Sequence, residues 1–270
     1  MNIKRKILIN VLRIMLIIII LILIFIFNGI VEIPSVNVKI NQFIERSEYK
    51  DTIIINNCNI DVYTITELKD YEKDDYIRVV NNEYLLEQKG IGNKGDIILT
   101  NRNPLLGYSG AFIRDLVEPF SKNFYLGHAN VVVDDGKTVI ECVGNDEKNN
   151  GVRRAESRWL KDIINVSNYE DIFIGLRIKG LNEEKREIFI ESLEDKIGKK
   201  YNYSFISIFN NAYYCTDLIT SSARSIDIKL NYDGFFVTGN DLIISNNLFI
   251  TFIFKRIEKD RFQLIYLEEV

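Results

Sequence analysis

One histidine and one of the three cysteines in this sequence are of the residue types that could act together in catalysis. His128 is the only histidine among the 270 residues, and it opens the run Gly127-His128-Ala129-Asn130, which continues into three valines. Cys215 lies far downstream, at the expected start of a helix. A thiolate is a strong nucleophile, and an imidazole is the usual partner that generates it. The two residues therefore predict a cysteine hydrolase or transferase if their side chains meet.

The strand that begins at His128 is expected to bring a third residue into place. An Asp-Gly pair at residues 135–136 is a strong signal for a tight hairpin turn. In the register of a two-residue turn, Asn130 faces Glu141. Because strand side chains alternate between faces, Glu141 then shares a face with His128, and Cys142 points the other way. Glu141 is thus predicted to accept a hydrogen bond from the imidazole and to orient it, as in a catalytic triad.

Other interpretations of these residues stay open. A hairpin loop one residue longer would turn every side chain of one strand over, and Glu141 could simply face solvent. Cys215 could be a small buried hydrophobe, as free cysteines often are. Its position at a helix start favours the thiolate and offers N–H groups to an oxyanion. Tyr214 is a candidate for a further oxyanion donor, and Asp96 is expected to be a structural turn residue.

Composition narrows the classes of function. A formal net charge of −4 and a pI near 5.3 argue against binding of nucleic acid. Cys58, Cys142 and Cys215 are too few and too far apart for a disulfide framework or a paired metal motif. A single histidine also excludes a His-rich zinc site. We therefore expect neither a metal nor a cofactor.

The amino-terminal segment resembles a membrane anchor. Residues 14–27 are an unbroken apolar run, and Lys4, Arg5 and Lys6 precede it. About twenty apolar residues can span a bilayer as a helix, and the basic residues place the amino terminus in the cytoplasm. A cleaved signal peptide would show a small-x-small site, and a buried core helix would show a polar face. We therefore predict an uncleaved transmembrane signal anchor over residues 1–29, with the remaining chain on the other side of the cell membrane.

The rest of the chain is expected to form one main domain. Residues 30–90 are interpreted as a linker and a small lead-in, with two short strands between residues 52 and 63. The main domain is predicted over residues 91–270. Within it, Asn182 is placed to cap a helix that has acidic residues in its first turn and that Gly198 ends. Helices beside hairpin-connected strands indicate an α+β fold.

From Gly95 to about Leu218 the chain resembles the NlpC-type cysteine hydrolases of the permuted, papain-like YiiX/YebB group. The resemblance implies an antiparallel sheet packed on helices, with Cys215 as nucleophile, His128 as base and Glu141 as orienting residue. The chain departs from the group's pattern at Asn202, where Asp is expected, and at Thr216-Asp217, which replaces a Ser-Glu-like pair. The matching motifs, in the permuted order with His before Cys, are Gly95-Asp96-Ile97-Ile98, Gly127-His128, Val139-Ile140-Glu141, Tyr201-Asn202-Tyr203 and Tyr214-Cys215-Thr216-Asp217.

Together these features predict a membrane-anchored, extracytoplasmic cysteine hydrolase that cleaves an amide bond in a cell-wall peptide. One alternative is an acyl hydrolase or acyltransferase that acts on lipid-linked acyl groups with the same triad. Apolar residues expected near the site, Leu105, Leu106, Phe205 and Phe209, would suit such a substrate. A second alternative is a surface binding protein with an inert papain-like fold.

Overall fold

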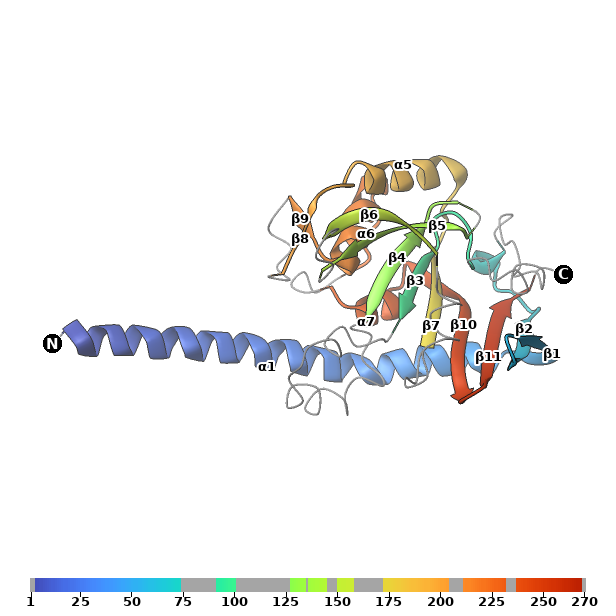
Figure 1. Ribbon diagram of the computed structural model, residues 1–270, viewed down its shortest axis with the longest axis horizontal. Helices are drawn as coiled ribbons and strands as arrows, with labels where there is room; N and C mark the ends of the chain where they lie inside the picture. Colours follow the sequence, from blue (N-terminus) through green and yellow to red (C-terminus); the bar gives the residue numbers. More distant parts are fainter. Residues whose placement is uncertain are drawn as a thin grey trace.

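The computed structural model describes residues 3–73, 91–100, 127–134, 136–144, 150–157, 172–203, 211–231 and 237–268. One large sheet dominates this part of the chain (Figure 1). Its strands are β1 (Glu48–Ile55), β2 (Cys58–Ile65), β3 (Ile97–Thr100), β4 (His128–Val132), β5 (Thr138–Val143), β6 (Gly151–Glu156), β7 (Ile172–Ile178), β10 (Leu248–Glu258) and β11 (Arg261–Leu267). They lie in the order β1-β2-β11-β10-β7-β3-β4-β5-β6.

The remaining described elements lie around this sheet. A two-stranded sheet pairs β8 (Lys200–Tyr201) with β9 (Ala212–Tyr213). The helices longer than a single turn are α1 (Ile3–Ile44), α5 (Glu183–Glu194), α6 (Cys215–Ala223) and α7 (Gly239–Ile244). Asn182 caps α5 by accepting a hydrogen bond from the Lys185 backbone N–H, which confirms the predicted start of that helix.

The large sheet is mixed, which corrects the expected fold. All neighbouring strands run antiparallel except β2 and β11, which are parallel and place Asn59 opposite Arg261. The predicted papain-like fold, an antiparallel sheet packed on helices, is therefore wrong: in the part of the chain that the structure describes, the large sheet is mixed and nine-stranded, and few helices accompany it. The difference arises because the β1–β2 hairpin, predicted as part of a separate lead-in, joins the sheet of His128. The predicted boundary at residue 90 lies at the edge of residues that the structure does not describe.

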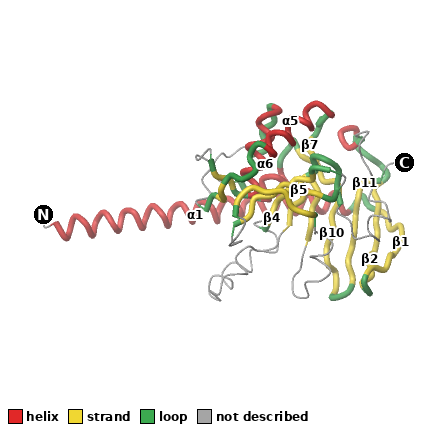
Figure 2. Tube along the Cα trace, turned by 45° about the horizontal axis from the view of Figure 1, so that its top comes forward, coloured by secondary structure: helices red, strands yellow, loops and turns green. Residues whose placement is uncertain are grey.

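The first helix also differs from expectation. Helix α1 runs without interruption from Ile3 to Ile44, and its amino-terminal part extends away from the sheet (Figures 1 and 2). Its carboxy-terminal part packs on the protein, where Val36, Ile40 and Phe43 are buried at helical spacing. Within the described ranges, no helix has both the length and the apolar character needed to cross a membrane. This finding contradicts the predicted transmembrane anchor and the single-pass, extracytoplasmic location inferred from it.

Apolar side chains are buried on both faces of the sheet. Alternation along β4 sends Val131 into a core that includes Phe189 of α5 and Leu218 of α6. Val132 belongs to a second cluster, which includes Phe254 of β10. Because α5 and α6 cover the first of these cores, the amino-terminal end of α6 comes close to the start of β4. This packing brings Cys215 near His128.

Gly175 is the position where β7 makes room for a neighbouring aromatic ring. It lies opposite Phe252 at a register shift in β10, and a Cβ atom there would lie 2.2 Å from the ring and 2.6 Å from Thr251 Oγ1. Phe252 is buried, so its ring cannot withdraw. We expect Gly175→Ala to lower the free energy of unfolding by roughly 1–3 kcal/mol through overpacking, as measured by urea denaturation. In a background of Phe252→Leu the same substitution should cost less, and equal costs in both backgrounds would contradict the explanation.

Candidate active site

Cys215 is the first residue of α6, as the sequence predicted, and Tyr214 is the N-cap residue. The thiol is partly buried. Two backbone N–H groups, those of Ala129 and Thr216, act on its sulfur and lower the pKa of the thiol. The Ala129 N–H can point toward the sulfur because the pairing of β4 with β5 ends at Asn130 and Glu141, so that no residue of β5 pairs with Ala129. The sulfur therefore sits where β4 and β5 separate, at the positive end of the α6 dipole.

His128 connects this thiol to a carboxylate. Asn130 pairs with Glu141, which confirms the predicted hairpin register. In this register, His128 Nε2 lies 2.7 Å from Glu141 Oε2. The imidazole also interacts with the Cys215 side chain, and this interaction raises the pKa of the ring and lowers that of the thiol. The structure thus brings together the three residues predicted for the triad, in the order thiol, imidazole, carboxylate.

The electrostatics of this arrangement favour a thiolate–imidazolium pair. Burial alone would raise the pKa of the Cys215 thiol, but the hydrogen bond from His128 and the two backbone N–H groups lower it below its ordinary value. Burial alone would lower the pKa of His128, but the bonds to Cys215 and Glu141 outweigh it and raise this pKa to about 10. Burial opposes ionisation of Glu141 too, yet His128 and Arg153 lower its pKa. All three shifts therefore favour the charged forms of these groups.

Arg153 is a residue of this site that the sequence analysis missed. It lies on β6 directly opposite Glu141, and its Nε donates to Glu141 Oε1 at 2.9 Å. The two carboxylate oxygens therefore have separate partners, Arg153 and His128. A signal was present in the sequence: opposite charges favour cross-strand pairing, and aligning the segment that forms β6 with β5 would have placed Arg153 beside Glu141.

The other two cysteines have environments that keep them neutral. Cys142 points away from Glu141, is buried, and donates from Sγ to the Tyr213 carbonyl at 2.9 Å. Burial raises the pKa of its thiol, and it raises that of Cys58 as well. The hydrogen-bonded, low-pKa environment of Cys215 thus distinguishes it from both.

Tyr214 and Asp96 occupy structural positions. The Tyr214 hydroxyl accepts a hydrogen bond from the Val237 N–H at 2.8 Å, and its ring is buried. Its role as an oxyanion donor therefore stays a prediction. Asp96 forms a buried ion pair with Arg177 through bonds of 2.6 and 2.9 Å and also accepts from the Asn93 N–H. This agrees with the structural role predicted for Asp96.

Two aromatic side chains pack together on the core that Cys215 also contacts. Tyr201 packs on the same core as Cys215, and its ring lies 4.9 Å from that of Tyr203. Gly144 makes this possible, because a Cβ there would approach both rings to 3.0–3.2 Å. The apolar residues considered for a lipid substrate, Leu105, Leu106, Phe205 and Phe209, lie outside the described residues.

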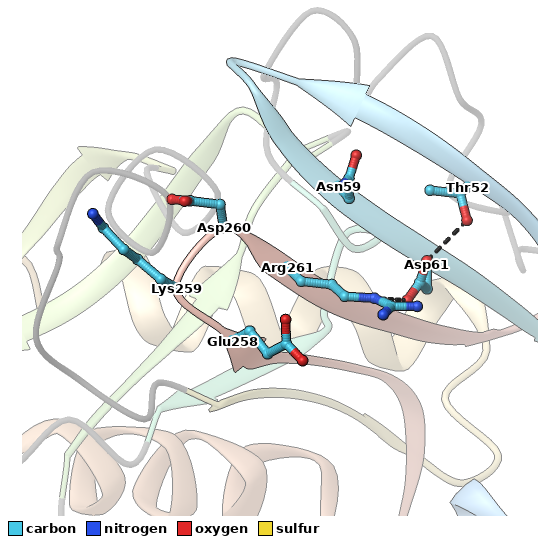
Figure 3. Close-up of a pocket in the computed structure, with 7 residues that line it drawn as sticks. All are labelled: Thr52, Asn59, Asp61, Glu258, Lys259, Asp260 and Arg261. Carbon is cyan, nitrogen blue, oxygen red and sulfur yellow. Dashed lines mark hydrogen bonds and ion pairs between the residues drawn. The ribbon is translucent and has the colours of Figure 1, made fainter.

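A polar pocket lies elsewhere, between the β1–β2 and β10–β11 hairpins (Figure 3). In it the Asp61 carboxylate accepts from Thr52 at 2.8 Å and from Arg261 at 2.7 Å. Strands β7 and β3 separate these hairpins from β4. Thr52, Asp61 and Arg261 pair with each other there, and no predicted catalytic residue lines the pocket. The pocket is therefore distinct from the Cys215 site.

The fold and the site define a mixed-sheet protein with a Cys–His–Glu arrangement at the end of one strand. No family model and no curated protein matches the chain. Among solved structures, the structure of this chain is similar to the crystal structure of the metalloprotein YiiX from Escherichia coli O157:H7, with 15% sequence identity and a TM-score of 0.42. The match covers 61% of this chain and 97% of YiiX. In the described part of this chain, no group of three or more His, Cys, Asp or Glu side chains is arranged to hold a metal ion.

Proposed function

We propose that this chain is a cysteine hydrolase that cleaves an amide or ester bond with Cys215 as its nucleophile. One observation carries the proposal: His128 is hydrogen-bonded to the buried Glu141 carboxylate and interacts with the Cys215 thiol, so that an imidazole links the two. In this order of groups the carboxylate orients the ring, and the ring holds the proton of the thiol.

The reaction follows from these positions. The Cys215 thiolate attacks the carbonyl carbon, and the carbonyl oxygen takes up the electron pair as an oxyanion. The start of α6 offers backbone N–H groups and a positive dipole end to that charge. As the tetrahedral intermediate collapses, the His128 imidazolium gives its proton to the departing nitrogen or oxygen, which leaves an acyl group on Cys215. His128 then takes a proton from water, the resulting hydroxide attacks the acyl carbon, and the thiolate is released.

We take the amide bond of a cell-wall-type peptide as the substrate class. This choice rests on the motifs shared with the NlpC-type group, in the permuted order of that group. An acyl ester of a lipid is the comparison substrate, because the same nucleophile and base would serve both bonds. Hydrolysis of the two classes by the purified full chain, measured side by side with Cys215→Ala, separates them.

The first test is the rate at which iodoacetamide alkylates Cys215 as a function of pH. The purified full chain is labelled for short times, and the three cysteine-containing peptides are quantified by mass spectrometry. We expect Cys215 to react well below pH 8.5, the ordinary thiol pKa, because His128 and two backbone N–H groups lower the pKa of its thiol. Cys58 and Cys142 serve as internal controls, since burial raises the pKa of both.

Two results would count against the proposal. Labelling of Cys215 that is no faster than labelling of Cys58 and Cys142 would mean that the pair is not activated. Fast labelling without any acyl–Cys215 adduct, across peptide amides and lipid esters, would instead favour the inert binding protein. In that case the Cys215→Ala variant should retain all binding of the wild type.

A further inference from the structure

We propose that Arg153 is a positioning residue of this site, which holds Glu141 in the orientation that His128 requires. The inference rests on the proposed function, because it assigns a role within the same Cys–His–Glu arrangement. Arg153 donates a hydrogen bond to the Glu141 carboxylate, which in turn is bonded to His128. It acts through Glu141, and therefore its effect must appear in the behaviour of Cys215.

Three neighbouring strands place the groups in a row. The register of β4, β5 and β6 sets Asn130, Glu141 and Arg153 opposite one another, with Glu141 on the central strand. Arg153 Nε donates to Oε1 at 2.9 Å, and His128 Nε2 lies 2.7 Å from Oε2. A carboxylate held at both oxygens cannot rotate without breaking one of these bonds. The bond from Arg153 therefore fixes the oxygen that faces the imidazole.

Burial makes the second partner of Glu141 important. The Glu141 side chain is only 12% exposed, and an ionised carboxylate is costly to bury without a partner. The charge of His128 depends on its proton, whereas an arginine is charged at every accessible pH. Among the described residues, the charged groups facing this carboxylate are His128 from β4 and Arg153 from β6, with Cys215 of α6 beyond the imidazole. Arg153 thus gives Glu141 a counter-ion that does not titrate.

The next residue of β6 provides a matched control. Arg154 points to the opposite face of the strand, where it forms an ion pair with Glu194 of α5. Both side chains of this pair are at least 40% exposed. Arg153→Gln and Arg154→Gln therefore remove the same charge from adjacent positions, but only the first removes it from the site.

The test is the pH profile of Cys215 alkylation in the full chain, for the wild type, Arg153→Gln, Arg153→Lys and Arg154→Gln. Glu141 supports the thiolate–imidazolium pair as a carboxylate, and this support is lost when the pH falls through its pKa. Removal of the Arg153 charge raises that pKa. We expect the acidic limb of the profile to move up by roughly one pH unit or more in Arg153→Gln, by less in Arg153→Lys, and not at all in Arg154→Gln.

The outcomes separate this inference from the proposed function. If wild-type Cys215 is activated and its profile is unchanged in Arg153→Gln, the positioning role is wrong and the proposed function stands. An equal shift of the profile in Arg154→Gln would also overturn the positioning role, because the loss of a positive charge at either position of β6 would then have the same effect. If wild-type Cys215 is not activated, both fail. If Arg153→Gln does not fold, the pH profile of Arg153→Lys takes its place. The profiles of Glu141→Gln and of Glu141→Gln/Arg153→Lys are then compared as well. They should be identical, because Arg153 acts on Cys215 only through the Glu141 carboxylate, and a difference between them would overturn the inference.

Discussion

Replacement of His128 by alanine is expected to slow the alkylation of Cys215 at pH 6 at least tenfold. It should also lower the turnover of an acyl substrate by roughly 10²–10⁴-fold, the contribution of a general acid–base group. Without the imidazolium the sulfur keeps the two backbone N–H bonds but loses its charged partner. The pKa of the thiol then rises, because burial raises it and only the two backbone N–H groups remain to lower it. A thiol with a pKa near 8.5 is less than about 1% ionised at pH 6, although its higher intrinsic nucleophilicity recovers part of the rate.

The controls for this variant lie in the same chain. Cys58 and Cys142 should react at unchanged rates in His128→Ala, since neither thiol is hydrogen-bonded to the imidazole. Glu141→Gln should give an intermediate loss, because the amide can still orient the ring but carries no charge. If His128→Ala alkylated Cys215 as quickly as the wild type, another group would have to generate the thiolate.

A second large effect is expected at the buried ion pair of Asp96 and Arg177. We expect Asp96→Asn to lower the free energy of unfolding by about 3–5 kcal/mol, because it leaves the guanidinium charge uncompensated. The side chains are only 2% and 4% exposed, and Arg177 donates two hydrogen bonds to the carboxylate. The measurement is urea denaturation followed by circular dichroism.

Comparison with an exposed pair shows whether burial is the reason. Arg154→Gln, which removes the exposed pair with Glu194, should cost less than about 1 kcal/mol. The double variant Asp96→Leu/Arg177→Met should recover much of the stability lost in Asp96→Asn, since no charge is then left buried. Equal costs for Asp96→Asn and Arg154→Gln would rule out a buried ion pair as the explanation.

Local signals in the sequence were sufficient to predict parts of the site. The Asp-Gly turn defined the β4–β5 register and placed Glu141 beside His128. The start of α6 at Cys215 and the cap of α5 at Asn182 follow from residues within one helical turn. These features depend on neighbours in the sequence, and such interactions can be recognised without the fold.

Features that depend on distant segments could not be predicted in this way. The parallel pairing of β2 with β11 joins segments 200 residues apart, so that no turn motif or residue spacing in the sequence predicts it. The apolar run at residues 14–27 was predicted as an anchor that ends near residue 29, whereas α1 continues to Ile44 because Val36, Ile40 and Phe43 pack into the core. Long-range packing decided both.

The position of β11 between β2 and β10 also determines when the sheet can be completed during synthesis. The β1–β2 hairpin leaves the ribosome long before its partner strand, and at 5–20 residues per second the interval is about 10–40 s for a separation of 200 residues. Throughout this time the edge of β2 has no neighbour to pair with. An open strand edge is a template for pairing with other chains. The nascent chain is therefore most exposed to aggregation before the strand that closes this gap has been made.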